Sequence, residues 1–307
     1  MSEKIENLLG EDRTFDPPSS IVENANATQE WFDLANEDRL AYWQKQALER
    51  ITWYKEPKEI LDDSDAPFYK WFKDGELNLA YNCLDRHLET DGDRIAFYWE
   101  GEPGDSQEIT YQDLYERVCK LSNGLKELGV KKGDRIAIYL GMTPEIVISM
   151  LACARIGAVH SVVFGGFSAE ALADRINDAE AKIVITADGA WRRGDIVPLK
   201  QNVDDSLKLT DHIESVIVVK RTENEVTMVD GRDYWYSELV DKQEADCEPE
   251  VMNAEDMLYI LYTSGTTAKP KGIVHTQAGY LTGVTTTHSA VFDVKEDDIY
   301  WCAADCG

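Results

Sequence analysis

Apolar residues follow two alternating patterns along the central part of the chain. From about residue 83, short runs of Val, Ile, Ala and aromatic residues alternate with segments in which apolar residues recur every three or four positions. The short runs predict strands at 95–99, 135–140, 159–164, 183–185 and 216–219. Continuous Val/Ile runs separated by helices are typical of parallel strands covered on both faces. The pattern therefore predicts an α/β fold with mostly parallel sheets, helices on both faces and right-handed crossovers.

Residues with known capping preferences bound the predicted helices. Thr110 can cap a helix that stops at Gly129. Its inward face, at steps of four and three, carries Leu114, Val118, Leu121, Leu125 and Leu128. Pro144 opens the next helix, which we expect to end near Gly157. Ser168 then caps a helix that carries Leu172 and Ile176.

The first 82 residues differ from this pattern. Residues 1–26 are polar and rich in Asp, Glu, Ser and Pro, which predicts an irregular acidic arm. Residues 27–82 contain aromatics at loosely helical spacing and a second aromatic cluster at 68–72. Because aromatic residues contribute large buried areas, we expect this segment to pack as an extension against the main body, residues 83–307.

Composition and charge narrow the function classes. The 307 residues include 31 Lys and Arg against 58 Asp and Glu, giving a formal net charge of −27 and a pI near 4.5. Such a field disfavours nucleic acids and anionic membrane surfaces as partners. No apolar run approaches the roughly 20 residues that a bilayer crossing needs, and the charged start lacks a signal-peptide core. We expect a cytoplasmic protein. The acidity fits either a solvated surface or adaptation to high salt.

The six cysteines do not suggest a metal site. None forms a C-x-x-C pair and the five histidines lie far from most of them, so we predict no metal ligands here. Cys119 and Cys153 fall in apolar periodic segments. We interpret the cysteines as structural thiols in a reducing compartment, with Cys302 and Cys306 as core residues and no catalytic thiol.

The segment 258–275 has the strongest chemical signal. Two predicted buried strands flank ten residues with two glycines, four hydroxyl side chains and two lysines. Backbone N–H groups, hydroxyls and ammonium groups together suit a polyphosphate, whereas an ordinary polar hairpin loop is the alternative. The loop is not a Walker A motif, because Pro270 occupies the place of its second glycine and no helix follows directly.

Residues 262–272 resemble the signature loop of the adenylate-forming acyl-CoA synthetases. Other segments narrow the resemblance to the acetyl-CoA synthetases: 162–168, 202–205, 273–276, 279–281 and 300–307, together with Trp31 and Tyr42-Trp43. The similarity runs from about residue 28 to the last residue. It implies that 83–307 is part of the large N-terminal domain of an adenylate-forming enzyme.

The resemblance implies a ligase with two half-reactions. Acetate attacks the α-phosphorus of Mg·ATP to give acetyl-adenylate and diphosphate, and the sulfur of coenzyme A then displaces AMP. The residues implied to cradle the β- and γ-phosphates are Thr263, Ser264, Gly265, Thr266 and Thr267, with Lys269 and Lys271 adding positive charge. Ala268 replaces the glycine usual in the family, at a cost of about 1 kcal/mol if that position needs a positive φ.

The resemblance also implies a coenzyme A site. The residues implied are Gly165 and Gly166, which allow close approach to the backbone, and Arg192, Arg193, Gly194 and Asp195 on the loop that meets the nucleotide end. Arg192 aligns with an arginine that can grip the 3′-phosphate. Asp195 stands where the family commonly has a second cation, and Arg193 can compensate.

Family members are about twice as long as this chain. The resemblance therefore identifies it as an N-terminal part, whose catalytic residues and magnesium ligand we expect beyond Gly307. The sheet would then lack strands and expose apolar surface. A ligase for propionate or another short acid remains an alternative, because the acid pocket would also lie further on. A non-catalytic nucleotide- or CoA-binding fragment is a second alternative. The oligomeric state is left open.

Overall fold

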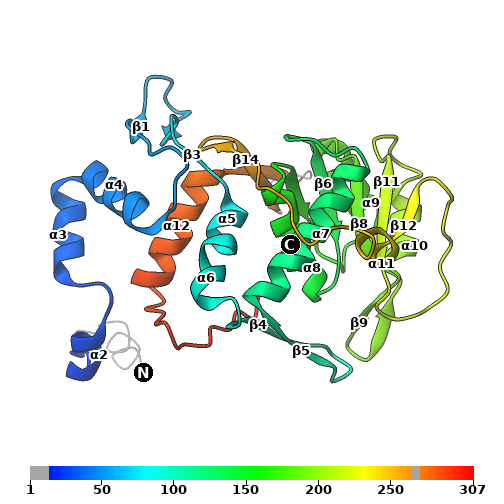
Figure 1. Ribbon diagram of the computed structural model, residues 1–307, viewed down its shortest axis with the longest axis horizontal. Helices are drawn as coiled ribbons and strands as arrows, with labels where there is room; N and C mark the ends of the chain where they lie inside the picture. Colours follow the sequence, from blue (N-terminus) through cyan, green and yellow to red (C-terminus); the bar gives the residue numbers. More distant parts are fainter. Residues whose placement is uncertain (1–13, 264–269) are drawn as a thin grey trace, which may run out of the picture.

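A mostly parallel sheet of seven strands organises the molecule. The structure is a computed structural model that describes residues 14–263 and 270–307. The strands are β6 (Arg135–Tyr139), β7 (Val159–Val162), β8 (Ile183–Ala187), β11 (Ser215–Val219), β12 (Asp233–Trp235), β14 (Met257–Thr263) and β15 (Lys271–Thr276). Their order is β12-β11-β8-β6-β7-β14-β15, and only the β14–β15 pair is antiparallel (Figure 1). The predicted α/β fold is confirmed.

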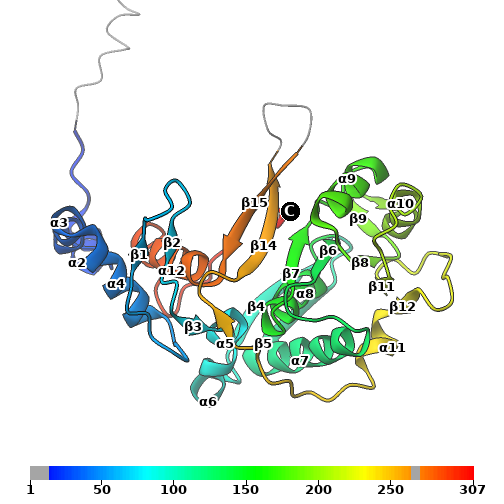
Figure 2. The ribbon, with the colours of Figure 1, turned by 90° about the horizontal axis from the view of Figure 1, so that it is seen from above.

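Helices cover both faces of this sheet. The helices α7 (Tyr111–Glu127), α8 (Pro144–Arg155) and α11 (Tyr236–Val240) lie on one face, and α9 (Ala169–Ala179) and α10 (Leu199–Ser206) lie on the other (Figure 2). The predicted caps are confirmed. Thr110 and Asp113 form a reciprocal capping box, and the Ser168 hydroxyl accepts from the Ala171 N–H. Gly129 follows α7 with a φ of +87°.

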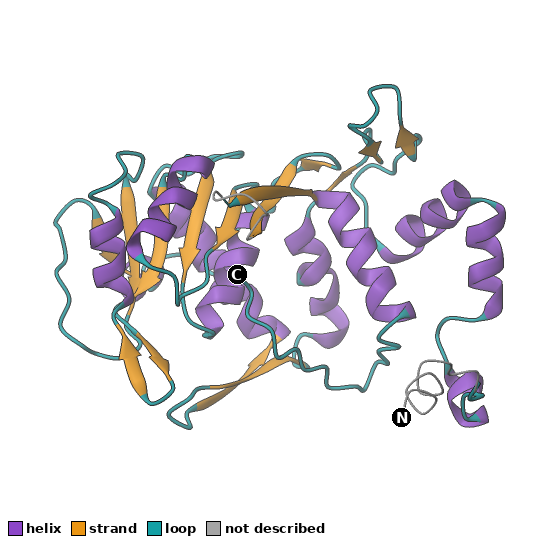
Figure 3. Ribbon diagram, turned by 180° about the vertical axis from the view of Figure 1, so that it is seen from behind, coloured by secondary structure: helices purple, strands orange, loops and turns teal. Residues whose placement is uncertain are grey.

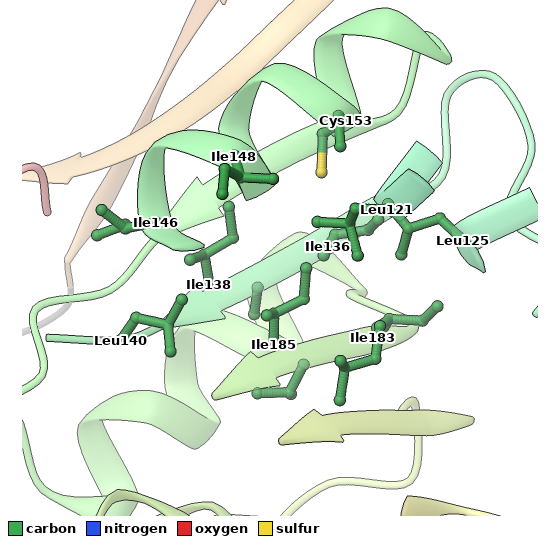
Figure 4. Packing of buried hydrophobic residues seen from close by; sticks show 14 of the residues in the cluster. Leu121, Leu125, Ile136, Ile138, Leu140, Ile146, Ile148, Cys153, Ile183 and Ile185 are labelled. Carbon is green, nitrogen blue, oxygen red and sulfur yellow. The ribbon is translucent and has the colours of Figure 1, made fainter. Parts of the chain in front are cut away.

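The main core fills both faces of the sheet, with the α7–α8 layer on one side and α9 and α10 on the other. Ile146, Ile148 and Cys153 of α8 are buried beside Ile136 and Ile138 of β6 (Figure 4). Because the side chains of β6 and β8 are buried on both faces, these strands read as continuous apolar runs rather than as alternating ones. The continuous apolar runs explain why both strands could be predicted from the sequence.

The N-terminal part is an array of short elements. It contains α2 (Ser19–Asn24), α3 (Gln29–Glu37), α4 (Arg39–Arg50), β1 (Leu61–Asp62), β2 (Lys70–Trp71), β3 (Glu76–Leu77), α5 (Leu79–Cys83), the 3-10 helix η1 (Asp85–His87) and α6 (Leu88–Asp91). Helix α12 (Gln277–Ala290) packs against α4 and α5 and joins this array to the rest (Figure 3).

Two expectations for the N-terminal part are corrected. The arm at 1–26 is not irregular throughout, because 19–24 form helix α2, which starts after Pro18. The chain just after α2 is held in place by a residue far along the sequence, since the Asn26 N–H donates to the Asp293 carboxylate at 2.7 Å. The aromatic cluster packs only in part: Phe72 is buried, whereas Phe68 is 72% exposed and Tyr69 is exposed, since both lie on the projecting β1–β2 hairpin.

Two small hairpins and a short ladder complete the fold. They pair β4 (Ile95–Glu100) with β5 (Ser106–Thr110), β9 (Ala190–Arg192) with β10 (Asp195–Val197), and β13 (Met252–Asn253) with β3. In the part of the chain that the structure describes, no helix has the length and apolar character needed to cross a bilayer.

The β14–β15 hairpin forms the exposed edge of the sheet. The interpretation that both strands are buried is wrong, because Lys271 to Val274 of β15 are exposed. Ile273 and Val274 are each nearly half exposed, so the expected uncovered apolar surface is present. Figure 2 shows this hairpin extending away from the other strands.

His160 on β7 makes the fold sensitive to acid. Its ring is buried and stacks on Tyr259 of β14, with the centroids 5.5 Å apart, and its Nδ1 has no partner among the described residues. Burial lowers the pKa of His160 to about 4. Because the unfolded chain has the ordinary value near 6.5, it binds more protons at acid pH.

We therefore expect the free energy of unfolding to decrease by about 3 kcal/mol as the pH falls from 6.5 through 4. Urea unfolding between pH 7 and pH 4 measures this change. His160→Phe, which keeps a ring but cannot ionise, should remove that part of the pH dependence. The exposed His212→Asn should retain it, and an unchanged slope in His160→Phe would contradict the assignment.

Candidate ligand site at the strand ends

A cavity of about 340 Å³ opens at the carboxyl ends of the parallel strands. Its lining includes Leu140 and Gly141 after β6, Val162 to Gly165 at the end of β7, Ala190 to Arg192 after β8, and Arg221 after β11. The strand order reverses here, since β6 lies between β7 and β8. In open parallel sheets this crevice is where ligands bind. The topology therefore places the cavity at a position suited to a ligand.

Two segments distant in sequence close the cavity. Trp99 to Glu102 come from the β4–β5 hairpin, and Asp305 to Gly307 come from the carboxyl-terminal segment. A Cβ atom on Gly307 would lie 2.9 Å from the Phe164 nitrogen, so this segment packs closely on the end of β7. The walls of the cavity thus come from the ends of four parallel strands, from the β4–β5 and β9–β10 hairpins and from the irregular carboxyl-terminal segment.

Arg192 provides a cation that is available to a ligand. Its guanidinium lies over the Phe164 ring, 4.6 Å from the centroid, and it makes no hydrogen bond or ion pair with another described residue. Stacking on an aromatic ring orients the planar group and leaves its N–H edge free. Arginine in this state suits the bidentate recognition of a phosphate or carboxylate.

The two glycines predicted for close approach lie next to this cation. A Cβ atom on Gly166 would lie 2.7 Å from Arg192 Nη1 and 2.5 Å from the Phe164 ring. On Gly165 it would lie 3.0 Å from the Leu140 carbonyl oxygen. Of the two, only Gly165 lines the cavity. The space beside Gly166 is filled by Arg192 and Phe164, which a side chain there would displace.

The other predicted residues of this loop lie at the tip of the β9–β10 hairpin. Arg193 and Gly194 have φ values of +55° and +84°, as a two-residue turn between paired strands requires. Their N–H groups donate to the Glu102 carboxylate at 3.0 and 2.5 Å. Arg193, Gly194 and Asp195 do not line the cavity, so of the predicted set only Arg192 and Gly165 line it, with Gly166 packed against Arg192.

Sequence reasoning missed Arg221. It lines the cavity, lies 5.1 Å over the Trp99 ring and pairs with Asp105 at 2.7 and 3.0 Å. Its loop is fixed by the buried Asp188, whose carboxylate accepts from the Arg221 N–H at 2.8 Å and the Thr222 N–H at 3.0 Å. The available signal was position, because Arg221 comes shortly after the buried parallel strand β11, as Arg192 comes after β8.

The predicted phosphate loop falls largely outside the described residues. Ser264, Gly265, Thr266, Thr267, Ala268 and Lys269 belong to that part. Thr263 and Lys271 are described, and they pair across the end of the β14–β15 hairpin. Both are exposed. The hairpin thus holds one hydroxyl and one ammonium group side by side at the base of the loop.

The cysteines differ from the expectation in one respect. Cys153 is buried, and burial raises its pKa to about 12, as suits a core thiol. Cys306 is half-buried and lines the cavity, whereas Cys302 is exposed, so its assignment to the core is wrong. Cys302 lies in the irregular segment after α12, where no element covers it.

Two sequence models of known families match most of this chain. The sequence model of the AMP-binding enzyme family matches residues 84–307, and that of the acetyl-coenzyme A synthetase N-terminus matches 17–83. An acetyl-coenzyme A synthetase of Streptomyces avermitilis is 58% identical over 308 residues, covering 100% of this chain and 47% of the relative.

Other acetyl-coenzyme A synthetases show similar agreement. That of Streptomyces coelicolor is 56% identical over 308 residues and that of Pasteurella multocida is 54% identical over 307. They cover 100% and 98% of this chain, and 47% of each relative. The chain thus spans about half the length of these curated relatives. The family match covers most of the chain, including every strand of the main sheet, and the chain therefore belongs to the AMP-binding enzyme family.

Proposed function

We propose that this chain is the N-terminal part of an AMP-forming acetate–CoA ligase. The reaction joins acetate and coenzyme A at the expense of ATP, through acetyl-adenylate, and releases AMP and diphosphate. The similarity to curated acetyl-coenzyme A synthetases over the whole chain supports the proposal. The observation that carries it in the structure is Arg192, which has no ion-pair partner among the described residues and lines a cavity at the strand ends, where a phosphate-bearing substrate can be bound.

In this proposal the cavity takes the nucleotide end of coenzyme A. Arg192 binds a phosphate of coenzyme A through its free N–H edge, and Gly165 keeps the cavity wall open. Arg193, Gly194 and Asp195 act indirectly, because their hairpin carries Arg192. Gly166 acts through the close approach of Phe164 and Arg192. The sulfur of coenzyme A then attacks the acyl carbon of acetyl-adenylate and AMP leaves.

The base of the β14–β15 hairpin is the proposed ATP phosphate site. Thr263 and Lys271 supply a hydroxyl and a positive charge, together with the five other predicted residues of the loop, Ser264, Gly265, Thr266, Thr267 and Lys269. Charge develops on the phosphate oxygens in the first half-reaction. In the proposal these groups therefore act by positioning the phosphates and by stabilising the developing charge. Among residues 14–263 and 270–307 no group of three or more His, Cys, Asp or Glu could hold a metal ion, and the proposal assigns no magnesium ligand to them.

The remaining parts of the proposal concern organisation and setting. Residues 27–82 form the extension and 83–307 part of the AMP-binding domain. The net charge of −27 supports small molecules rather than nucleic acid or an anionic membrane as partners. We propose a cytoplasmic setting. The acid pocket is not among the assigned residues, and we propose acetate over propionate because the relatives are named for acetate.

The test is an assay of the complete protein encoded by the gene. With acetate, ATP, Mg²⁺ and coenzyme A, we expect AMP and acetyl-CoA in equal amounts, and without coenzyme A we expect acetate-dependent exchange of diphosphate into ATP. Propionate in a parallel reaction tests the acid. Coenzyme A binding without AMP release from either acid would contradict the ligase and favour a binding module.

A further inference from the structure

Glu102 is an acidic residue in the wall of the cavity that the proposed function assigns to coenzyme A. Glu102 and Arg192 both line this cavity, yet no ion pair joins either of them to another described residue. A carboxylate in this place is unexpected, because it repels a phosphate and competes with it for the arginine. The groups that bind the Glu102 carboxylate therefore decide whether Arg192 stays available to a ligand.

The Glu102 carboxylate binds the backbone at the tip of the β9–β10 hairpin. Its Oε2 accepts from the Arg193 N–H at 3.0 Å, and its Oε1 accepts from the Gly194 N–H at 2.5 Å. Both residues have a positive φ, and successive N–H groups in a turn can face one anion. Hydrogen bonds to an ionised acceptor are stronger than those between neutral groups. The carboxylate is thus bound by the turn and not by Arg192.

These two bonds hold the tip of a short hairpin. Strands β9 and β10 are joined by three residue pairs, of which Arg192 and Asp195 are the pair next to the turn. In the part of the chain that the structure describes, no other hydrogen bond joins residues 190–197 to another element. Because an isolated two-stranded hairpin is marginally stable in water, the contact with Glu102 helps to keep Arg192 over the Phe164 ring.

The β4–β5 hairpin that carries Glu102 is itself anchored at the strand ends. The Trp99 indole N–H donates to the Met142 carbonyl at 2.8 Å, and Asp105 pairs with Arg221 at 2.7 and 3.0 Å. The Arg221 guanidinium also lies over the Trp99 ring. Figure 3 shows both hairpins projecting on the same side of the molecule. An anchored hairpin thus presents Glu102 to a hairpin with fewer contacts of its own.

We infer that Glu102 is a positioning residue for the binding of coenzyme A. Its carboxylate holds the turn at Arg193 and Gly194, and through this turn it fixes the place from which Arg192 meets a phosphate of coenzyme A. The same two bonds occupy the carboxylate, so that it does not pair with Arg192. The inference rests on the proposed function, since it requires the cavity to take coenzyme A.

The direction in which Glu102→Ala changes the KM for coenzyme A tests this role on the complete protein. A carboxylate that acted only by its charge would repel the phosphate, and its removal would lower the KM. Loss of a positioning residue raises the KM instead, and we expect about a 3- to 10-fold increase. Turnover at saturating coenzyme A and the acetate-dependent exchange of diphosphate into ATP should be unchanged. Steady-state kinetics and the exchange assay measure these quantities.

Glu108→Ala is the matched control. It removes the same charge from the same hairpin, but Glu108 is an exposed residue of β5 that does not line the cavity. We expect the KM for coenzyme A to stay within about twofold of that of the parent protein. Glu102→Gln keeps one acceptor oxygen and should raise the KM by less than Glu102→Ala, which keeps the test open if Glu102→Ala does not fold.

The double variant of Glu102→Ala with Arg192→Ala shows whether Glu102 acts through Arg192. Because the residue that Glu102 positions is then gone, the KM for coenzyme A should lie within about twofold of that of Arg192→Ala alone. If Glu102→Ala raises the KM by the same factor with and without Arg192, the two residues act independently, which would overturn the inference.

A KM at or below that of the parent protein in Glu102→Ala, or in Glu102→Gln if the alanine variant does not fold, would also overturn the inference. An equal rise in Glu108→Ala or an unchanged KM in Arg192→Ala would do the same. A parent protein that forms no acetyl-CoA would contradict the proposed function, and the inference with it. Failure of the inference alone is therefore recognised by normal acetyl-CoA formation in the parent protein together with one of the preceding results.

Discussion

Arg192→Ala should raise the KM for coenzyme A of the complete protein by about 10- to 100-fold, since hydrogen bonds to a charged group contribute about 1.5–3 kcal/mol. Arg192 has no protein partner other than the Phe164 ring among the described residues, so its loss leaves nothing unpaired in the free protein. The acetate-dependent exchange of diphosphate into ATP should be unchanged, because coenzyme A takes no part in it. Steady-state kinetics and the exchange assay measure the two quantities.

Arg193→Ala is the matched control for this prediction. Arg193 is the next residue, but its side chain does not line the cavity, and its backbone N–H bond to Glu102 survives the substitution. We expect a change in KM of less than about threefold, in keeping with loss of a screened surface charge. A larger effect from Arg193→Ala than from Arg192→Ala would show that the phosphate is bound outside the cavity.

Asp85→Ala should lower the free energy of unfolding by about 3–5 kcal/mol, the usual cost of leaving a buried charge unpaired. Arg155 is 1% exposed and donates to both oxygens of Asp85, at 2.8 and 2.9 Å. Its Nε donates to the Cys247 carbonyl and its guanidinium lies over Tyr115. This pair thus joins α8 to the N-terminal part and to the segment before β13. Urea unfolding measures the loss.

Two comparisons sharpen this second prediction. Glu127→Ala removes an exposed pair with Lys242 at 2.6 Å and should leave the unfolding midpoint unchanged. The double variant Asp85→Leu with Arg155→Met replaces the buried pair by apolar groups and should be more stable than Asp85→Ala. If Asp85→Ala unfolds at the same urea concentration as the parent protein, the pair does not hold these segments together.

The features that were predictable from sequence are those set by local patterns. Thr110, Pro144 and Ser168 begin helices because capping and the fixed φ of proline depend on a few neighbouring residues. The buried strands were recognisable because both faces of the sheet are covered. Exposure was predicted less well. Phe68 and Tyr69 look like core residues by type, but their hairpin projects from the body, which no local pattern reveals.

The chemistry of the site was also predictable from sequence only in part. Glycine, hydroxyl and lysine residues close together in sequence predict a polyphosphate loop, because residue types and short spacings carry that information, whereas the anion site at Arg192 is implied by the family resemblance. Only the tertiary structure decides which cations face one cavity. It joins Arg192 to Arg221 and Trp99, turns Arg193 and Asp195 away, and places Arg175 between Phe167 and Tyr262. The physical reason is that the ends of parallel strands meet at one edge of the sheet, whatever their separation along the chain.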